Sequence, residues 1–261
     1  MTTRQRLGAG LVMSTALACT FGSGMPISAQ SAQARKAAPA AKRPDFNGIW
    51  QAMTPANYNI LDHSAEAGVP AGQGIVEGNE IPYLPAAKAR QESNFTNRLA
   101  LDPENKCYMP GVPRAMYMPF PFQIAQSGDF IMMAFEWGMK VRRIHLDGSK
   151  HPEGIPETWM GDSRAHVEGQ TLVIDTNDFN DQTWFDKAGN HHSDALHTIE
   201  RLTPRGKDII DYEVTIEDPK TFSRPWTMRF PLYRRLEKNI QLLEYPCVSF
   251  MEDEYAGQAG K

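Results

Sequence analysis

The stretch DIIDYEVTIEDPKTFSRPWTMRFPLYRR, residues 208–235, decides the fold class. In its first half every second side chain is apolar, at Ile210, Tyr212, Val214 and Ile216. The second half repeats the pattern at Trp226, Met228, Phe230 and Leu232. Because successive side chains of a strand point to opposite faces, this alternation turns one row toward a core and the other toward water. The stretch therefore predicts two amphipathic β-strands in succession.

Similar runs fill most of the chain from Phe122 onward. Phe130–Trp137 (FIMMAFEW) is almost continuously apolar, which predicts a strand covered on both faces. Pairs typical of turns separate the runs, at Gly128-Asp129, Asp147-Gly148, Glu168-Gly169 and Arg205-Gly206. We expect about eight or nine strands, near residues 46–52, 121–127, 129–137, 139–146, 171–176, 195–202, 208–216, 226–235 and 240–246. Regularly spaced antiparallel strands without helices between them favour a closed barrel or a sandwich.

The segment between the first expected strand and Phe122 has a different texture. Residues 51–121 are irregular and rich in Gly, Pro, Asn and Ala, so we expect a long N-terminal insertion. One short helix is predicted within it at Ala86–Arg98, because Pro85 is favoured in a first helical turn.

The opening of the domain favours the barrel over the sandwich. Asp45–Trp50 (DFNGIW) resembles the Gly-x-Trp signature that begins the first strand of lipocalin-like barrels. The resemblance implies that Gly48 permits a tight entry and that Trp50 closes the base of the barrel. The expected fold is therefore mainly β, an antiparallel lipocalin-like barrel.

A second resemblance rests on seven motifs spread along the chain. They are PDFNGIW (44–50), MPFPFQI (118–124), RRIHLDG (142–148), TWMGDS (158–163), DTNDFNDQTW (175–184), HHSDALHTIER (191–201) and VTIEDPKTFSRPWT (214–227). With these motifs the chain resembles a family of exported bacterial proteins with a lipocalin-like, or calycin-like, β-barrel. The resemblance implies an exported protein and a barrel, and it implies no particular reaction.

The first 34 or so residues have the order of a secretory signal peptide. Arg4 and Arg6 precede an apolar stretch, and small residues follow at two candidate cleavage sites, Ile27-Ser28-Ala29 and Ala32-Gln33-Ala34. Glycines and Pro26 interrupt the stretch, so it is a poor membrane-spanning helix. We expect a periplasmic or secreted protein without stable membrane insertion; a lipoprotein attached through Cys19 is the less favoured alternative.

The expected mature chain is acidic. Residues 1–34 contain two of the 27 Lys+Arg and no acidic residue, which leaves 25 Lys+Arg against 31 Asp+Glu, a net charge of −6. The longest basic cluster lies in an Ala/Pro-rich linker at residues 35–44, so we expect no nucleic-acid partner. Residues 45–261 are then predicted to form a single domain.

Cysteine usage agrees with export. Removal of Cys19 with the signal leaves Cys107 and Cys247, which favours a disulfide between them, with two buried free thiols as the alternative. Two cysteines so far apart in sequence form neither a zinc motif nor a CxxC motif, and HExxH is absent. We expect no metal and no cofactor.

Polar residues concentrate in two connections, Trp159–His166 and Asp175–His197. Loops at one rim of a barrel commonly carry function, and a histidine beside a carboxylate forms a general base with a fixed tautomer. We therefore predict His192, His197 and Asp194 as catalytic residues. The predicted substrate-binding residues are Trp159, Asp162, Asp175, Trp184 and Arg143, the arginine because it could hold an anionic group. Turn formation and structural hydrogen bonds are the alternative roles.

The sequence favours two functions, an enzyme and a carrier, over the others. Its many aromatic and Met side chains suit a pocket for a small apolar or aromatic molecule. No GxSxG elbow, phosphate-binding Gly-rich loop or dinucleotide fingerprint is present. The chain is predicted to be a cofactor-independent lyase, isomerase or hydratase that uses His and Asp. The alternative is a carrier that binds such a molecule without turnover, and a structural or interaction protein is less favoured.

Overall fold

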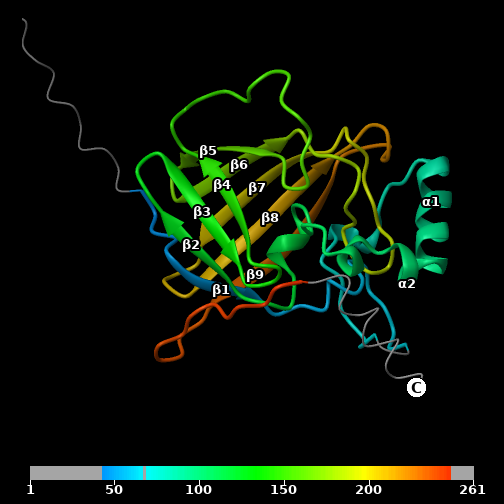
Figure 1. Cartoon of the computed structure of the whole chain (residues 1–261), viewed down its shortest axis with the longest axis horizontal. Helices are drawn as coiled ribbons and strands as arrows, with labels where there is room; N and C mark the ends of the chain where they lie inside the picture. The colour runs from blue at the N-terminus through cyan, green and yellow to red at the C-terminus, as the bar shows by residue number, and fades with distance from the viewer. Residues whose placement is uncertain (1–42, 67–68, 248–261) are drawn as a thin grey trace, which may run out of the picture. The chain divides into compact units, whose positions relative to one another are not determined.

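Nine β-strands close into a barrel in the computed structural model, which describes residues 43–66 and 69–247 (Figure 1). The strands are β1 (Gly48–Ala52), β2 (Phe122–Gln126), β3 (Phe130–Phe135), β4 (Lys140–His145), β5 (Asp162–Glu168), β6 (Thr171–Asn177), β7 (His197–Pro204), β8 (Ile209–Glu217) and β9 (Trp226–Arg234). They follow one another around the ring in chain order, and β9 pairs with β1. The predicted lipocalin-like barrel is confirmed, and the sandwich is excluded.

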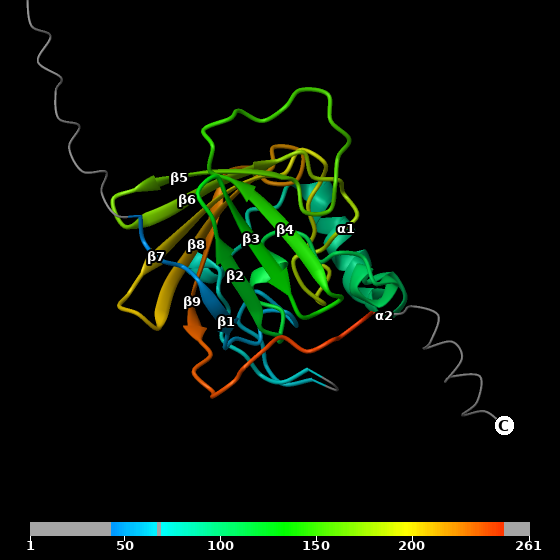
Figure 2. The same ribbon diagram turned by 60° about the vertical axis from the view of Figure 1, so that its left-hand side comes forward.

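One pair of strands departs from the antiparallel arrangement. β4 and β5 run parallel, with Ile144 opposite Ser163, whereas the other neighbouring pairs are antiparallel. A parallel pair needs a crossover connection of about a dozen residues or more. Residues 146–161 supply it and arch over the outside of the barrel (Figure 2). Asp147-Gly148, predicted as a hairpin turn, lies instead at the start of this crossover.

Strand β5 was not among the predicted strands, and its burial pattern explains why. Its inward residues include Ser163 and Ala165, which are small, so the strand lacks an alternating row of large apolar side chains. Conversely, the strand predicted at 240–246 does not form; Tyr245 makes only an isolated bridge to Trp137. Because β1 and β9 already pair, the closed ring has no free edge for it.

The two strands of the deciding stretch have the predicted orientation. In β8 and β9 the apolar rows are buried: Ile210, Tyr212, Val214 and Ile216, then Trp226, Met228, Phe230 and Leu232. β3 was predicted to be covered on both faces, and this is wrong. Its residues alternate between buried and partly exposed, because the strand belongs to a barrel whose outer surface faces water.

The Gly-x-Trp motif fits the place where β1 meets β2 and β9. Trp50 is buried, its Nε1 donates to the carbonyl of Phe46 at 2.9 Å, and the Arg234 guanidinium lies 4.2 Å from its ring centre. Gly48 has a φ of 138°, and a Cβ there would lie 2.0 Å from Arg234. A larger residue at position 48 would therefore displace the arginine that covers Trp50.

An ion pair is buried inside the barrel. Arg142 on β4 donates through one terminal nitrogen to Glu200 Oε1 on β7 at 3.0 Å, and its other terminal nitrogen contacts Glu200 Oε2. Arg142 also donates to Ser163 Oγ and Thr176 Oγ1, at 3.1 and 3.0 Å. Tyr212 completes the cluster by donating to Glu200 Oε1 at 2.8 Å, and burial raises the pKa of this phenol well above its usual value. We call these five residues the interior polar cluster.

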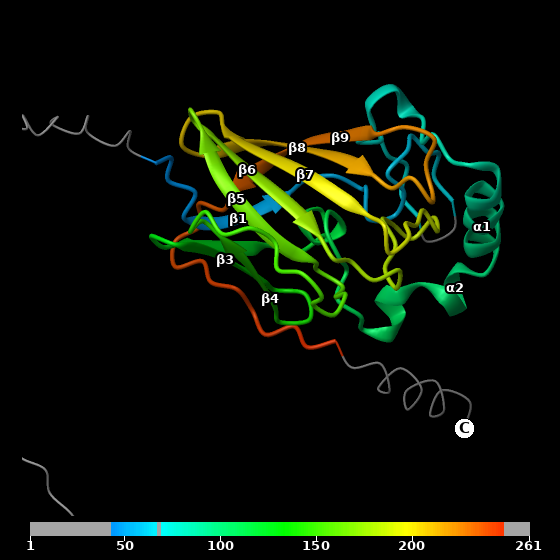
Figure 3. The same ribbon diagram turned by 90° about the horizontal axis from the view of Figure 1, so that it is seen from above.

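Helices and irregular segments gather at one end of the barrel (Figure 3). Helix α1 (Pro85–Thr96) confirms the predicted helix, and a single turn, α2 (Arg98–Leu101), follows it. Three short 3₁₀ helices, η1 (Glu77–Asn79), η2 (Pro103–Lys106) and η3 (Arg114–Met116), lie in the same part of the chain. α1 begins at Pro85, as the preference of proline for a first helical turn predicts.

The predicted disulfide is present between Cys107 and Cys247, whose Cα atoms are 5.4 Å apart. It fixes the end of a C-terminal segment, residues 235–247, which we call the strap. The strap follows the side of the barrel near β3 and β4, where Tyr245 O accepts from the backbone of Gly138 at 2.8 Å. The described residues all belong to one compact unit, Lys42–Lys261, and the predicted signal peptide lies outside them.

Candidate functional site

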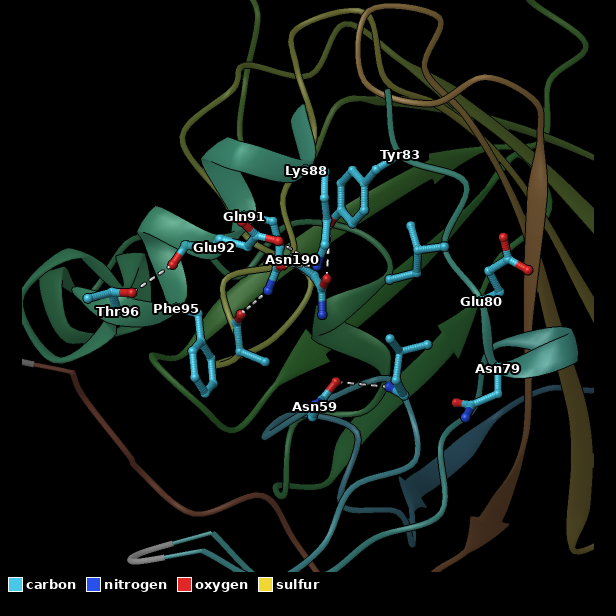
Figure 4. Close-up of a pocket in the computed structure, with 13 residues that line it drawn as sticks. Asn59, Asn79, Glu80, Tyr83, Lys88, Gln91, Glu92, Phe95, Thr96 and Asn190 are labelled. Atoms are coloured by element: carbon cyan, nitrogen blue, oxygen red, sulfur yellow. Dashed lines mark hydrogen bonds and ion pairs between the residues drawn. The ribbon is translucent and has the colours of Figure 1, made fainter. Parts of the chain in front are cut away.

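A pocket of about 530 Å³ lies between α1 and the irregular segment that precedes it (Figure 4). α1 forms one wall with Lys88, Gln91, Glu92, Phe95 and Thr96. The opposite wall consists of Asn59, Leu61, Asn79, Glu80, Ile81 and Tyr83. The β6–β7 connection, residues 178–196, adds Ala188 and Asn190. This volume falls within the range of small-molecule sites.

Asp186 does not line the pocket but holds two of the segments that do. The carboxylate is fully buried and accepts from the backbone nitrogen of Ile60 at 2.9 Å. It also accepts from the backbone nitrogen and Nδ2 of Asn190, at 3.1 and 2.6 Å. Ile60 lies between the pocket residues Asn59 and Leu61. Asp186 therefore ties one wall of the pocket to the β6–β7 connection.

Tyr83 continues this chain of hydrogen bonds to the surface of the pocket. Its hydroxyl donates to Asn190 Oδ1 at 3.1 Å (Figure 4). The same hydroxyl accepts from the backbone nitrogen of His191 at 3.3 Å. Burial and the negative charge of Asp186 raise the pKa of Tyr83 well above its usual value, so the hydroxyl keeps its proton. The series Asp186, Asn190 and Tyr83 is thus a fixed polar wall.

His191 packs against that wall. Its ring stacks on Tyr83 with centroids 5.8 Å apart, and burial lowers its pKa to about 4. The imidazole is therefore neutral at pH 7. Its Nδ1 is buried and has no hydrogen-bond partner among the residues that the structure describes.

The carboxyl group of Asp186 gives a pH-dependent prediction. Burial raises its pKa to about 6, although Asn190 and Ile60 donate hydrogen bonds to the ionised form. Because the pKa is higher in the folded state than its usual 3.8, the folded state binds this proton more tightly. Relative to Asp186→Asn, the wild type should therefore gain about 2 kcal/mol of stability as pH falls from 7.5 to 4.5.

Chemical denaturation of both proteins over this pH range measures the effect. Carboxylates elsewhere are present in both proteins, so their pH dependence cancels in the difference. A difference in unfolding free energy that stays constant from pH 7.5 to 4.5 would contradict the raised pKa of Asp186.

A second polar cluster lies on the outer face of the barrel and brings together three residues predicted from the sequence. Asp175 Oδ1 on β6 contacts His197 Nε2 at 2.9 Å and His151 Nε2 at 3.1 Å. Nδ1 of His197 lies 3.2 Å from Glu217 Oε2, and Nδ1 of His151 lies 2.8 Å from Asp162 Oδ1. Predicted residues Asp162, Asp175 and His197 therefore share one network, which His151 bridges from the crossover.

In both His151 and His197, each of the two ring nitrogens lies within hydrogen-bond distance of a carboxylate oxygen. A neutral imidazole has one N–H and one lone pair, so all four contacts are hydrogen bonds only when both rings carry two N–H groups. Each ring nitrogen of His151 and His197 thus has a carboxylate oxygen as its partner, and neither ring presents a free nitrogen to a ligand. Partial burial raises the pKa of Asp162, but hydrogen bonds from Arg164 and His151 outweigh it and hold that pKa below its usual range.

No family model matches the chain, and no curated protein or solved structure is significantly similar to it. Within residues 43–66 and 69–247, no helix is long and apolar enough to cross a membrane. In the same ranges, no group of three or more His, Cys, Asp or Glu side chains is arranged to hold a metal ion.

His192 lies apart from the network and is buried. Its Nε2 is 2.7 Å from Thr183 Oγ1, and its Nδ1 is 2.9 Å from the carbonyl of Ser193. The rings of Phe179 and Phe185 pack against it, and burial lowers its pKa. A neutral ring that donates to Ser193 and accepts from Thr183 satisfies both nitrogens. The geometry accounts for His192 as a structural residue, and its predicted catalytic role stays a prediction.

The other predicted site residues are dispersed. Trp159 stacks on Tyr108, Arg143 lies over the ring of Phe130, and Asp194 pairs with Lys220 at the surface. Trp184 is buried and bridges to His191 through the backbone. The structure brings none of these four residues into the pocket beside α1.

The pocket residues were not among those predicted from the sequence. Asn59 and Glu80 lie in irregular stretches and Asn79 ends the short helix η1, in a part of the chain where amide and acidic residues also form ordinary turns. Asp186 lies in the polar connection 175–197, but nothing in the local sequence points to its contact with Ile60, which lies 126 residues away. The pocket depends on these long-range contacts.

Proposed function

We propose that this is an exported protein that binds a small molecule in the pocket beside α1 and does not transform it. The observation that carries the proposal is the fixed wall of the pocket, in which buried Asp186 holds both Ile60 and Asn190. A wall that is ordered before the ligand arrives reduces the entropy lost on binding. This supports binding, which both functions expected from the sequence require, and the state of the predicted catalytic residues decides between them.

The state of the two predicted catalytic histidines also supports binding over catalysis. A general base needs a free lone pair within reach of its substrate. Thr183 occupies the free nitrogen of His192, and carboxylates lie at both nitrogens of His197. A lyase or isomerase that uses either ring would first have to break these contacts.

Phe95 provides the test of the site. It lines the pocket and is 37% exposed, so Phe95→Ala removes pocket surface without opening the core. We expect about tenfold weaker binding of any compound that occupies the pocket, because an aromatic contact contributes about 0.5 to 1.5 kcal/mol in addition to the apolar area that it buries. The measurement is a thermal-shift screen of metabolites, followed by calorimetric titration of each compound that binds.

Leu99→Ala is the matched control, because Leu99 lies in the next helical turn, is 88% exposed and does not line the pocket. Its affinity for the same compounds should equal that of the wild type. Compounds that bind wild type, Phe95→Ala and Leu99→Ala equally would remove this pocket as the binding site.

Export has its own test. The expected order of positive, apolar and small residues predicts cleavage after Ala29 or Ala34. The intact mass of the protein isolated from the periplasm or medium should correspond to a chain that begins at Gln30 or Arg35. A membrane-bound species that retains Met1 would contradict this part of the proposal.

A further inference from the structure

We infer that the pocket beside α1 binds a neutral polyhydroxylated ring, such as a saccharide; this inference rests on the proposed binding function and names its ligand class. Nine of the thirteen lining residues have polar side chains. A wholly apolar ligand would leave many of these groups without hydrogen bonds. The pocket therefore suits a ligand that forms many hydrogen bonds and also has an apolar face.

The side-chain amides of Asn59 and Asn79, on the wall opposite α1, have N–H groups available to a ligand. Asn59 Oδ1 accepts from the backbone nitrogen of Leu61 at 3.0 Å, and Asn79 Oδ1 accepts from that of Asp62 at 2.8 Å. These bonds fix which end of each amide is oxygen. The Nδ2 groups of Asn59 and Asn79 are left without a partner among the described residues, so each has N–H donors for a ligand oxygen.

The neighbouring carboxylate of Glu80 can only accept hydrogen bonds, so it needs a ligand that donates them. Glu80 follows Asn79 on the same wall, is exposed, and has no hydrogen-bond or ion-pair partner among the described residues (Figure 4). Its oxygens need donors, whereas the two Nδ2 groups need acceptors. A hydroxyl group both donates and accepts, so adjacent hydroxyls on one ring satisfy both kinds of group.

An apolar surface faces this polar wall. Phe95 projects from α1 on the other side of the pocket (Figure 4). Leu61 and Ile81 add aliphatic surface between the polar residues of the wall that carries Asn79 and Glu80. A pyranose ring has hydroxyls around its edge and C–H groups on its faces. It can therefore pack a face against Phe95 while its hydroxyls reach Asn79 and Glu80.

The charges of the pocket disfavour an anionic ligand. Lys88 Nζ already contacts Gln91 Oε1 at 2.7 Å and Glu92 Oε1 at 3.7 Å. Glu80 and Glu92 outnumber this single lysine among the lining residues. A carboxylate or phosphate ligand would meet net negative charge, whereas a neutral polyol would not.

The experiment titrates the full mature chain with three sets of probes: neutral mono- and disaccharides, aromatic carboxylic acids, and primary alkylamines. We expect a saccharide to bind, with affinity at least about tenfold lower in Glu80→Ala and in Phe95→Ala. Glu153→Ala is the matched control for charge, because Glu153 is exposed in the crossover and does not line the pocket. Leu99→Ala again controls for the loss of apolar surface.

A conservative variant separates a hydroxyl donor from a cation. Glu80→Gln keeps an acceptor oxygen and should retain most saccharide affinity, whereas an amine ligand would lose as much in Glu80→Gln as in Glu80→Ala. An amine or aromatic acid that binds in a Phe95-dependent manner would overturn the saccharide assignment and leave the binding function intact. If no probe binds, or if binding is insensitive to Phe95→Ala, both the ligand class and the pocket are rejected.

Discussion

Replacing Glu200 by Gln is expected to lower the free energy of unfolding by about 3 to 5 kcal/mol. The two partners of the ion pair are almost completely buried inside the barrel, with side-chain exposures of 1% for Arg142 and 0% for Glu200. The variant leaves the guanidinium charge in the barrel without a counter-charge. Desolvation is then no longer offset by the attraction between the two groups. Urea denaturation followed by intrinsic tryptophan fluorescence measures the loss.

The double variant Arg142→Met/Glu200→Gln provides the control. Without the arginine, the amide oxygen introduced at position 200 can still accept the hydrogen bond from Tyr212, and Ser163 Oγ lies 3.1 Å from Thr176 Oγ1. We therefore expect the double variant to be more stable than the sum of the two single variants predicts, by about 1 to 3 kcal/mol. Additive losses would show that the two charges do not depend on each other.

The interior polar cluster also explains why one strand was missed and others were predicted. In β8 and β9 the inward rows are large and apolar, so alternation is visible in the sequence. In β5 the inward residue Ser163 accepts a hydrogen bond from Arg142. The other partners of Arg142 are Thr176 on β6 and Glu200 on β7. The alternation of apolar and polar residues along a sequence indicates which apolar side chains are buried. It does not reveal a buried polar side chain whose hydrogen-bond partner lies on another strand.

The candidate site was predictable only in part, for a similar reason. Asp162, Asp175 and His197 converge because β5, β6 and β7 are neighbours, and a dense run of polar residues at strand ends signals such a cluster. The pocket beside α1 gives no such signal. Its walls come from the insertion and from the β6–β7 connection, and Asp186 joins them through backbone and amide groups that carry no sequence signature.

Removing the disulfide is expected to have the other large effect on stability. Cys107 and Cys247 are 140 residues apart in sequence, and closing a loop of this length restricts the unfolded chain. The chain-entropy relation gives about 5 kcal/mol for the stabilisation. We expect Cys107→Ser/Cys247→Ser to lose about 3 to 5 kcal/mol of unfolding free energy, since measured values often fall below the entropic limit.

The loss should first appear in the strap, because few other contacts hold it. Gly138 donates to Tyr245 O and Leu243 donates to Glu136 Oε2, both at 2.8 Å, while Phe120 packs on Tyr245. Hydrogen exchange at the amides of Gly138 and Leu243 should therefore accelerate in the double serine variant, while amides in β8 keep their order of protection. Reduction of the wild type should reproduce this pattern, and thiol titration of the unreduced, denatured chain should find no free thiol on Cys107 or Cys247. If the amides of Gly138 and Leu243 exchange equally in both proteins, hydrogen bonds rather than the disulfide hold the strap in place.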